Sequence, residues 1–132
     1  MKTTVSKILA AYEIISHAKA AHNSWQIVEC AMWMRGISRS FNELAESLKK
    51  KYAPENLQEL LDAEEELTEE QKNVLAEYYK NTTDALVAEG NKEIEVVVIL
   101  DDDVVKDFIS TNEFTVEQSI DLYEFLKKLG ES

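Results

Sequence analysis

The feature that most constrains this 132-residue chain is a run of apolar residues spaced alternately four and three positions apart. The run consists of Cys30, Met34, Ile37, Phe41, Leu44 and Leu48. This is the a/d spacing that turns one side of a long helix toward a partner helix. It predicts a helix from about Trp25 to Tyr52. Ala53 and Pro54 end this helix, because proline lacks the amide hydrogen and restricts the residue before it.

Two further helices follow from apolar stripes and terminal signals. An apolar stripe at three- and four-residue steps predicts an opening helix over about residues 4–21. The capping-box pattern Thr68-x-x-Gln71 predicts another long helix, which Gly90 and Asn91 end. This helix can pack antiparallel along the helix 25–52, because the connection between them is short and polar. We therefore predict a mainly α fold built on a long antiparallel helical hairpin.

The C-terminal part adds one short β-strand and further helices. Residues 93–100 are rich in β-branched side chains and are bounded by turn residues, which is typical of a strand. Asp101–Asp103 cap a short helix, and a second capping box, Thr115-x-x-Gln118, opens a last helix over about residues 116–129. A chain of this length is expected to form one domain. Its predicted parts are N-terminal helices (1–52), an acidic linker (53–67), a third helix (68–90) and the strand with C-terminal helices (93–132).

A lone strand needs partners for its backbone donors and acceptors. Three arrangements stay open at this point. Residues 1–7 could pair with it inside the chain, two copies could pair strand to strand, or a partner protein could add a strand of its own. The central residues Val96, Val97 and Val98 are therefore candidate partner-binding residues.

The net charge of −12 is unevenly distributed. Residues 1–52 carry eight Lys and Arg against four acids, a net of +4, so residues 53–132 carry −16. One interpretation is that the halves neutralise each other. The other is a dipolar surface that orients assembly with further copies or with a basic partner. Direct nucleic-acid binding is disfavoured, because the overall charge repels phosphate.

The acidic stretch 55–77 holds nine acids opposed by Lys72 alone. Such a block can imitate a phosphate backbone and occupy a DNA-binding protein, or it can be a solvated, flexible connector. The candidate partner-binding acids are Glu64, Glu65, Glu66, Glu69 and Glu70.

The start of the helix 25–52 is apolar nearly all round. Trp25, Met32 and Trp33 stand beside the apolar seam. Such a segment is either the centre of a multi-helix core or a contact surface for another subunit, where Trp and Met are enriched. These three residues are candidates for partner contact.

The sequence contains no recognisable catalytic or metal-binding pattern. Cys30 lies on the apolar seam, which favours a buried small hydrophobe over a nucleophile. The spacing of His17, His22 and Cys30 does not match a zinc site, and Asp101–Asp103 lack the glycine of a calcium loop. We expect no enzymatic activity, no cofactor, no metal and no small-molecule substrate.

The apolar segments and the single cysteine bear on where in the cell the protein is located. No apolar run approaches the roughly 20 residues that cross a bilayer, and the start lacks a signal-peptide pattern. A lone cysteine suits a reducing compartment. We expect a cytoplasmic protein without membrane contact.

Three parts of the sequence form a further pattern: the opening Val5-Ser6-x-Ile8-Leu9-x-Ala11-x-Glu13, the segment 93–103, and Phe114-Thr115-x-x-Gln118 with Leu126. In these parts the chain resembles a family of small tailed-bacteriophage proteins of unknown function. The sequence departs from the family pattern at residues 31–34. The resemblance covers nearly the whole chain and implies a phage or prophage origin with no established activity.

These patterns together predict a non-enzymatic phage-type interaction or assembly protein. We expect it to self-associate into a homo-oligomer or to dock on a larger phage component. The alternative is an acidic inhibitor of a host DNA-binding or defence protein, acting through the stretch 55–77. A third class is an enzyme with an unrecognised acidic site.

Overall fold

The computed structural model describes residues 2–18 and 24–131. Within these residues the chain forms six helices and two short strands, so the predicted mainly α fold is confirmed. The chain divides into two compact units, which are described separately. Unit 1 comprises residues 1–40 and 91–132, and unit 2 comprises residues 41–90. The prediction of a single domain stays a prediction.

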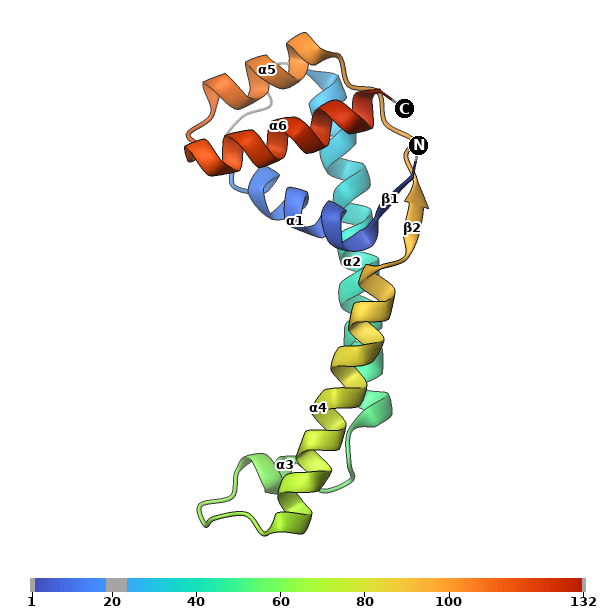
Figure 1. Cartoon of the computed structure of the whole chain (residues 1–132), viewed down its shortest axis with the longest axis vertical. Coiled ribbons are helices and arrows are strands. Elements are labelled where there is room, and N and C mark those ends of the chain that lie inside the picture. Colours follow the sequence, from blue (N-terminus) through green and yellow to red (C-terminus); the bar gives the residue numbers. More distant parts are fainter. Residues whose placement is uncertain (1, 19–23, 132) are drawn as a thin grey trace. The chain divides into compact units, whose positions relative to one another are not determined.

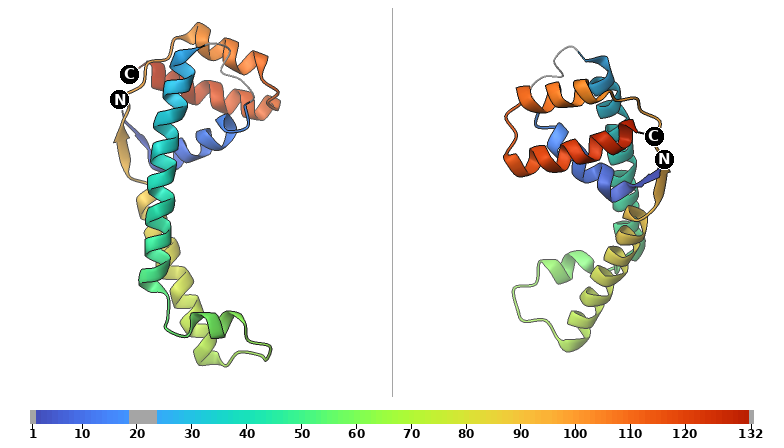
Figure 2. Two further views of the ribbon diagram at one scale, coloured as in Figure 1. Left: turned by 180° about the vertical axis from the view of Figure 1, so that it is seen from behind. Right: turned by 45° about the horizontal axis from the view of Figure 1, so that its top comes forward.

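Unit 1 contains a closed hydrophobic core. The helices α1 (Val5–Ile15), α5 (Asp102–Thr111) and α6 (Val116–Gly130) surround it together with the first part of α2 (Trp25–Tyr52), as Figure 1 shows. Helices α5 and α6 lie side by side in both views of Figure 2. The buried side chains are Ile8, Ala11, Ile15, Ile27, Cys30, Met34, Leu100, Val105, Phe108, Leu122, Leu126 and Leu129.

The helix ends of unit 1 agree with the sequence in part. At the start of α6 both arms of the predicted capping box are present, each 3.1 Å long. The opening helix, predicted over 4–21, is wrong at its C-terminal end, because α1 stops at Ile15. The hydroxyl of Ser16 donates to the Glu13 carbonyl (2.8 Å), and the Ala18 amide donates to the Ile15 carbonyl (2.9 Å). These three-residue spacings tighten the chain into a turn; the remainder of that prediction, from residue 19, lies outside the described residues.

The predicted strand pairs within the chain. The strand β1 (Lys2–Thr4) runs antiparallel to β2 (Glu93–Glu95), and Thr3 stands opposite Ile94. Of the three arrangements considered for this strand, the structure contains pairing within the chain. The predicted extent, 93–100, is wrong beyond Glu95. The described residues of β1 supply partners for Glu93–Glu95 only, so residues 96–100 have no ladder.

Unit 2 is the predicted helical hairpin. The last part of α2 packs with α4 (Glu69–Gly90), and the short helix α3 (Leu57–Leu61) lies in the connection (Figure 1). The predicted bounds of α2 are confirmed, and α4 begins directly after Thr68. There the Thr68 amide donates to Gln71 Oε1 (2.9 Å) and the Gln71 amide donates to Thr68 Oγ1 (3.2 Å).

Burial in unit 2 is shallow. Leu60 is its one buried apolar side chain among residues 41–90. These apolar side chains of the two hairpin helices are only half-buried: Phe41, Leu44, Leu48, Leu75, Tyr78 and Ala85. On α4, Val74 is 37% exposed, whereas its neighbour Leu75 is half-buried. Thr82 is 7% exposed, and its hydroxyl has no hydrogen-bond partner within the described chain.

Candidate interaction surfaces

The segment Val96–Leu100 lies on unit 1 with its side chains alternating in and out. Val96 and Val98 pack against the core and Leu100 is buried, whereas Val97 and Ile99 are 69% and 75% exposed. Of the three valines predicted to contact a partner, Val97 is thus the one that faces outward. Ile99 belongs with it, and the two-residue period from Val97 is the signal that identifies it.

The three Trp and Met candidates at the start of α2 have different surroundings. Trp33 is half-buried and packs against the core of unit 1. Trp25 is 65% exposed, and its indole N–H donates to a carboxylate oxygen of Glu29 one turn later. Met32 is 52% exposed. Two of the three are therefore available at the surface.

Met32 also lines a hollow of about 340 Å³ in unit 1. Its walls come from α1, α2 and α5 and include Tyr12, Ile27, Met32, Arg35 and Phe108. Arg35 is exposed and makes no ion pair or hydrogen bond within the described chain. No local pattern predicts this hollow, because its lining residues are distant in sequence.

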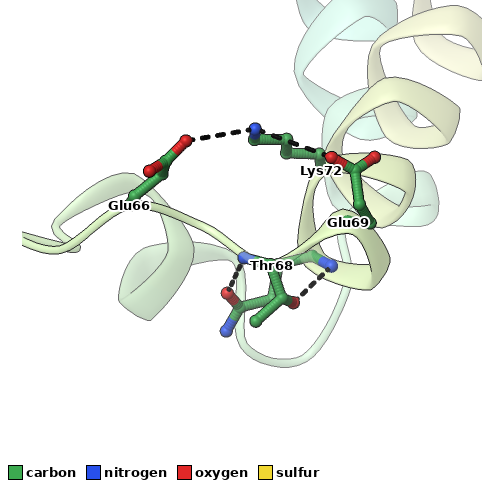
Figure 3. A network of polar contacts seen from close by, with 5 residues as sticks. Glu66, Thr68, Glu69 and Lys72 are labelled. Atoms are coloured by element: carbon green, nitrogen blue, oxygen red, sulfur yellow. Dashed lines mark hydrogen bonds and ion pairs between the residues drawn. The ribbon is translucent and has the colours of Figure 1, made fainter.

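The acidic candidates lie around the start of α4 in unit 2. All five, Glu64, Glu65, Glu66, Glu69 and Glu70, are exposed. Figure 3 shows Lys72 between two of them, with its Nζ 3.7 Å from Glu66 Oε1 and 3.9 Å from Glu69 Oε1. An exposed pair of this kind contributes little to stability. The other three acids have no ion-pair partner within the described chain, so the stretch keeps most of its negative charge.

The sequence did not point to one polar cluster on the surface of unit 1. Asp102 accepts hydrogen bonds from Lys106 Nζ (2.9 Å) and from the Tyr123 hydroxyl (2.7 Å). These hydrogen bonds, from Lys106 first and then Tyr123, lower the pKa of Asp102. The same contacts raise the pKa of Lys106 and of Tyr123. The cluster joins α5 to α6, and its groups are held in their ordinary protonation states rather than poised for proton transfer.

The predicted aspartate cap of α5 is only partly correct. Asp101 is the N-cap residue, but its carboxylate makes no capping hydrogen bond. It accepts instead from the Gln26 side-chain amide (3.1 Å), and the Asp101 backbone amide donates to Gln26 Oε1 (2.9 Å). This pair ties the end of segment 96–100 to α2.

The thiol of Cys30 is not exposed for chemistry. It is 1% exposed, as its position on the apolar seam predicts, and burial raises its pKa to about 12. A thiol is a nucleophile only as the thiolate, so Cys30 is inert at neutral pH. In the part of the chain that the structure describes, no three His, Cys, Asp or Glu side chains group as metal ligands. His22 lies outside that part.

No protein-family model, curated protein or solved structure gives a significant match to this chain. The resemblance to the phage family therefore stays a prediction. Among the described helices, none is both long enough and apolar enough to span a bilayer.

Proposed function

We propose that this chain is a non-enzymatic interaction protein of the phage-assembly type and that it self-associates through unit 2. The observation that carries the proposal is the shallow burial of the hairpin. Leu60 is buried, but the seam residues of α2 and α4 are only half-buried. Docking on a larger phage component would use the resulting assembly. The expected location is the host cytoplasm or the virion.

A hairpin of two helices can bury only part of each apolar stripe. A helix must bury its apolar stripe against another element, and two helices alone leave the outer half of each seam in water. A second hairpin can cover that half and complete a four-helix bundle. A second copy is the occupant that fits best, because it presents the same apolar spacing and a two-fold axis makes such a face self-complementary.

Exposed apolar side chains beside the seam support the same arrangement. On α4, Val74 is 37% exposed and Tyr79 is 52% exposed. The rings of Tyr78 and Tyr79 are tilted, with centroids 5.3 Å apart. In a bundle these side chains would leave water, which contributes favourably to association.

The test is the mass of the particle in solution. Sedimentation velocity over a wide concentration range should give at least twice the mass of one chain. The double variant Val74→Glu/Tyr79→Glu should shift it to the monomer, because it places charge at the edge of the proposed interface while altering only exposed positions. Val116→Glu is the matched control, since Val116 is an exposed valine of unit 1. A wild-type chain that stays monomeric throughout would contradict the proposal.

Exposure of the acidic stretch favours a second candidate function, inhibition of a DNA-binding protein by phosphate mimicry. Glu64, Glu65 and Glu70 are exposed without an ion-pair partner in the described chain. Changing these three to lysine should abolish capture of a basic DNA-binding partner and leave the oligomer intact. The control changes Glu13, Asp121 and Glu124, three exposed acids of unit 1. Equal loss in both variants would point to net charge alone and reject mimicry.

A further inference from the structure

The hollow of about 340 Å³ in unit 1 has mainly apolar walls. They come from α1 and the turn after it, from α2 and from α5, and consist of Ile15, Ala18, Ile27, Val28, Ala31, Met32 and Phe108. Arg35 is the one charged side chain among the described residues that line the hollow. A concave site of a few hundred Å³ with apolar walls and few polar groups is the usual form of a small-molecule site. The hollow therefore has the size and the composition to hold a small ligand.

Two hydrogen-bond donors in this wall have no acceptor of their own. Within the described chain, neither the Arg35 guanidinium nor the Tyr12 hydroxyl makes a hydrogen bond or an ion pair. The third polar side chain of the wall is Ser16, whose hydroxyl already donates to the Glu13 carbonyl (2.8 Å). The hollow thus combines an apolar interior with two donors, on α1 and α2, that the oxygen atoms of a ligand can engage.

The charge of the wall determines the class of ligand. The chain has 26 acids, yet none of the described residues that line the hollow is acidic. One guanidinium group presents paired N–H donors that match a carboxylate in a bidentate contact, and it balances one negative charge. A phosphate dianion would leave its second charge unbalanced beside apolar walls, which is unfavourable. The wall therefore fits a monocarboxylate better than a phosphate or a cation.

We propose that the hollow binds a small carboxylate with an apolar body, such as a medium-chain fatty acid. Arg35 holds the carboxylate, Tyr12 donates a further hydrogen bond to it, and the apolar chain lies between α1, α2 and α5. No His, Asp or Glu is among the described lining residues, so the ligand is bound and not converted by acid–base chemistry. The described lining residues all belong to unit 1, and the site does not require the association of hairpins proposed for unit 2.

Three probes with the same eight-carbon chain test the proposal with the full-length protein: octanoate, octanol and octyltrimethylammonium. Isothermal titration calorimetry, with each probe below the concentration at which it aggregates, should show saturable one-to-one binding of octanoate. Octanol should bind at least about fivefold more weakly, because it lacks the charge that Arg35 pairs with. The ammonium probe should not bind, because its charge has the same sign as that of Arg35. Equal binding of octanoate and octanol, or no binding of octanoate, would overturn the proposal.

Arg35→Gln tests the charged contact, and Arg39→Gln is the matched control. Both arginines are exposed on α2, but Arg39 does not line the hollow. Arg35→Gln should weaken octanoate binding by about tenfold or more and leave octanol binding unchanged, because it removes a charge-assisted hydrogen bond. Arg39→Gln should change octanoate binding by less than about twofold, since salt screens an exposed charge at a distance. Equal losses in the two variants would assign binding to net charge and refute the proposal.

Amide chemical shifts locate the ligand. Octanoate should shift the resonances of residues that line the hollow, above all Ile27, Ala31 and Phe108, and should leave those of unit 2 in place. Tyr12→Phe keeps the ring and removes the hydroxyl, so it should weaken octanoate binding by about threefold. Shifts confined to residues outside the wall would contradict the proposed site.

A peptide that ends in a leucine carboxylate tests whether the carboxylate belongs to a protein chain instead. It should bind at least about tenfold more weakly than octanoate, because its amide groups would leave water for apolar walls. A peptide that binds as tightly as octanoate would assign the hollow to the chain end of a partner protein and reject a small ligand. The hairpin variant Val74→Glu/Tyr79→Glu should bind octanoate as the wild type does, and octanoate should leave the sedimenting mass unchanged, so the two proposals can fail separately.

Discussion

Units 1 and 2 are both mainly helical, yet they bury apolar surface to very different extents. The described residues of unit 1 bury twelve side chains in one core, whereas Leu60 is the one buried apolar side chain among residues 41–90 of unit 2. The difference lies in layering. Unit 1 has helices on several sides of its core, but unit 2 is essentially one pair of helices. Because apolar burial is the main favourable contribution to folding, we expect unit 1 to depend on its own core and unit 2 to gain more from further burial.

The largest expected effect contrasts one phenylalanine from each unit. Phe108 is 2% exposed in the core of unit 1, so Phe108→Ala should lower the free energy of unfolding by about 3–5 kcal/mol. Phe41 is half-buried on the seam of unit 2, and Phe41→Ala should cost only about 1–1.5 kcal/mol at high dilution. Urea denaturation followed by circular dichroism measures both.

The two phenylalanine variants should also differ in how their stability depends on protein concentration. If hairpins associate, Phe41 is buried further in the oligomer, so the cost of Phe41→Ala should rise with protein concentration. The cost of Phe108→Ala should rise little, since its side chain is already enclosed by its own unit. Equal costs for the two variants at all concentrations would contradict the view that the units differ in self-sufficiency.

Two glycines provide the next contrast, because alanine should lower the stability at one position and raise it at the other. A Cβ atom on Gly130 would overlap the Leu100 carbonyl oxygen, because the end of α6 lies directly against that backbone. Gly130→Ala should therefore destabilise unit 1 by about 1–3 kcal/mol. Gly36 is an exposed helical glycine with nothing within 4 Å of such an atom, and Gly36→Ala should stabilise by about 0.5–1 kcal/mol. Thermal unfolding of both variants checks the signs, and a destabilising Gly36→Ala would reveal a close neighbour at that position.

Short-range patterns in the sequence predicted the helix ends that depend on neighbouring residues. The a/d spacing gave the bounds of α2, and the Thr68 and Thr115 capping boxes gave the starts of α4 and α6. Each of these depends on residues within one or two turns. The end of α1 was harder, because Ser16 bonds the Glu13 carbonyl and competes with a helix that the apolar stripe would allow to continue.

Tertiary placement accounts for what sequence patterns could not predict. The strand within 93–100 was recognised, but the residues that pair with it belong to β1, some ninety residues away in the sequence. The hollow lined by Met32 and Arg35 and the cluster around Asp102 join distant segments in the same way. For the candidate surfaces, composition pointed only to segments, while the outward residue of a segment, such as Val97 rather than Val98, follows from the packing against the core.

A smaller effect is expected at Thr82, the most enclosed side chain of α4. Its hydroxyl is buried and has no partner within the described chain, and such a group costs free energy in the folded state. Thr82→Val keeps the shape and removes the hydroxyl, so it should stabilise unit 2 by about 1 kcal/mol. Thr83→Val is the control, since Thr83 is exposed on the same helix. Hydrogen exchange of α4 amides measures the change, and equal slowing in both variants would attribute it to helix propensity instead.

The smallest expected effect is a pH dependence carried by Asp102 in unit 1. Lys106 and Tyr123 lower the pKa of this carboxyl below its ordinary value of 3.8. A group whose pKa is depressed by folding stabilises the folded state above its ordinary pKa, and this stabilisation is lost as the pH falls through the folded-state value. The stability difference between the wild type and Asp102→Asn should therefore be constant near neutral pH and shrink under acid conditions.

Asp103 supplies the matched control for this titration. It shares the first turn of α5 with Asp102 but accepts no hydrogen bond from a described side chain. Asp103→Asn removes the same favourable charge from the helix start without breaking the contact to Tyr123. Urea titrations from about pH 7 to pH 2.5 should show a steeper acid loss in the wild type and in Asp103→Asn than in Asp102→Asn. Identical pH profiles for all three proteins would mean that the bridge between α5 and α6 adds nothing to unit 1, whose stability would then rest on its apolar core alone.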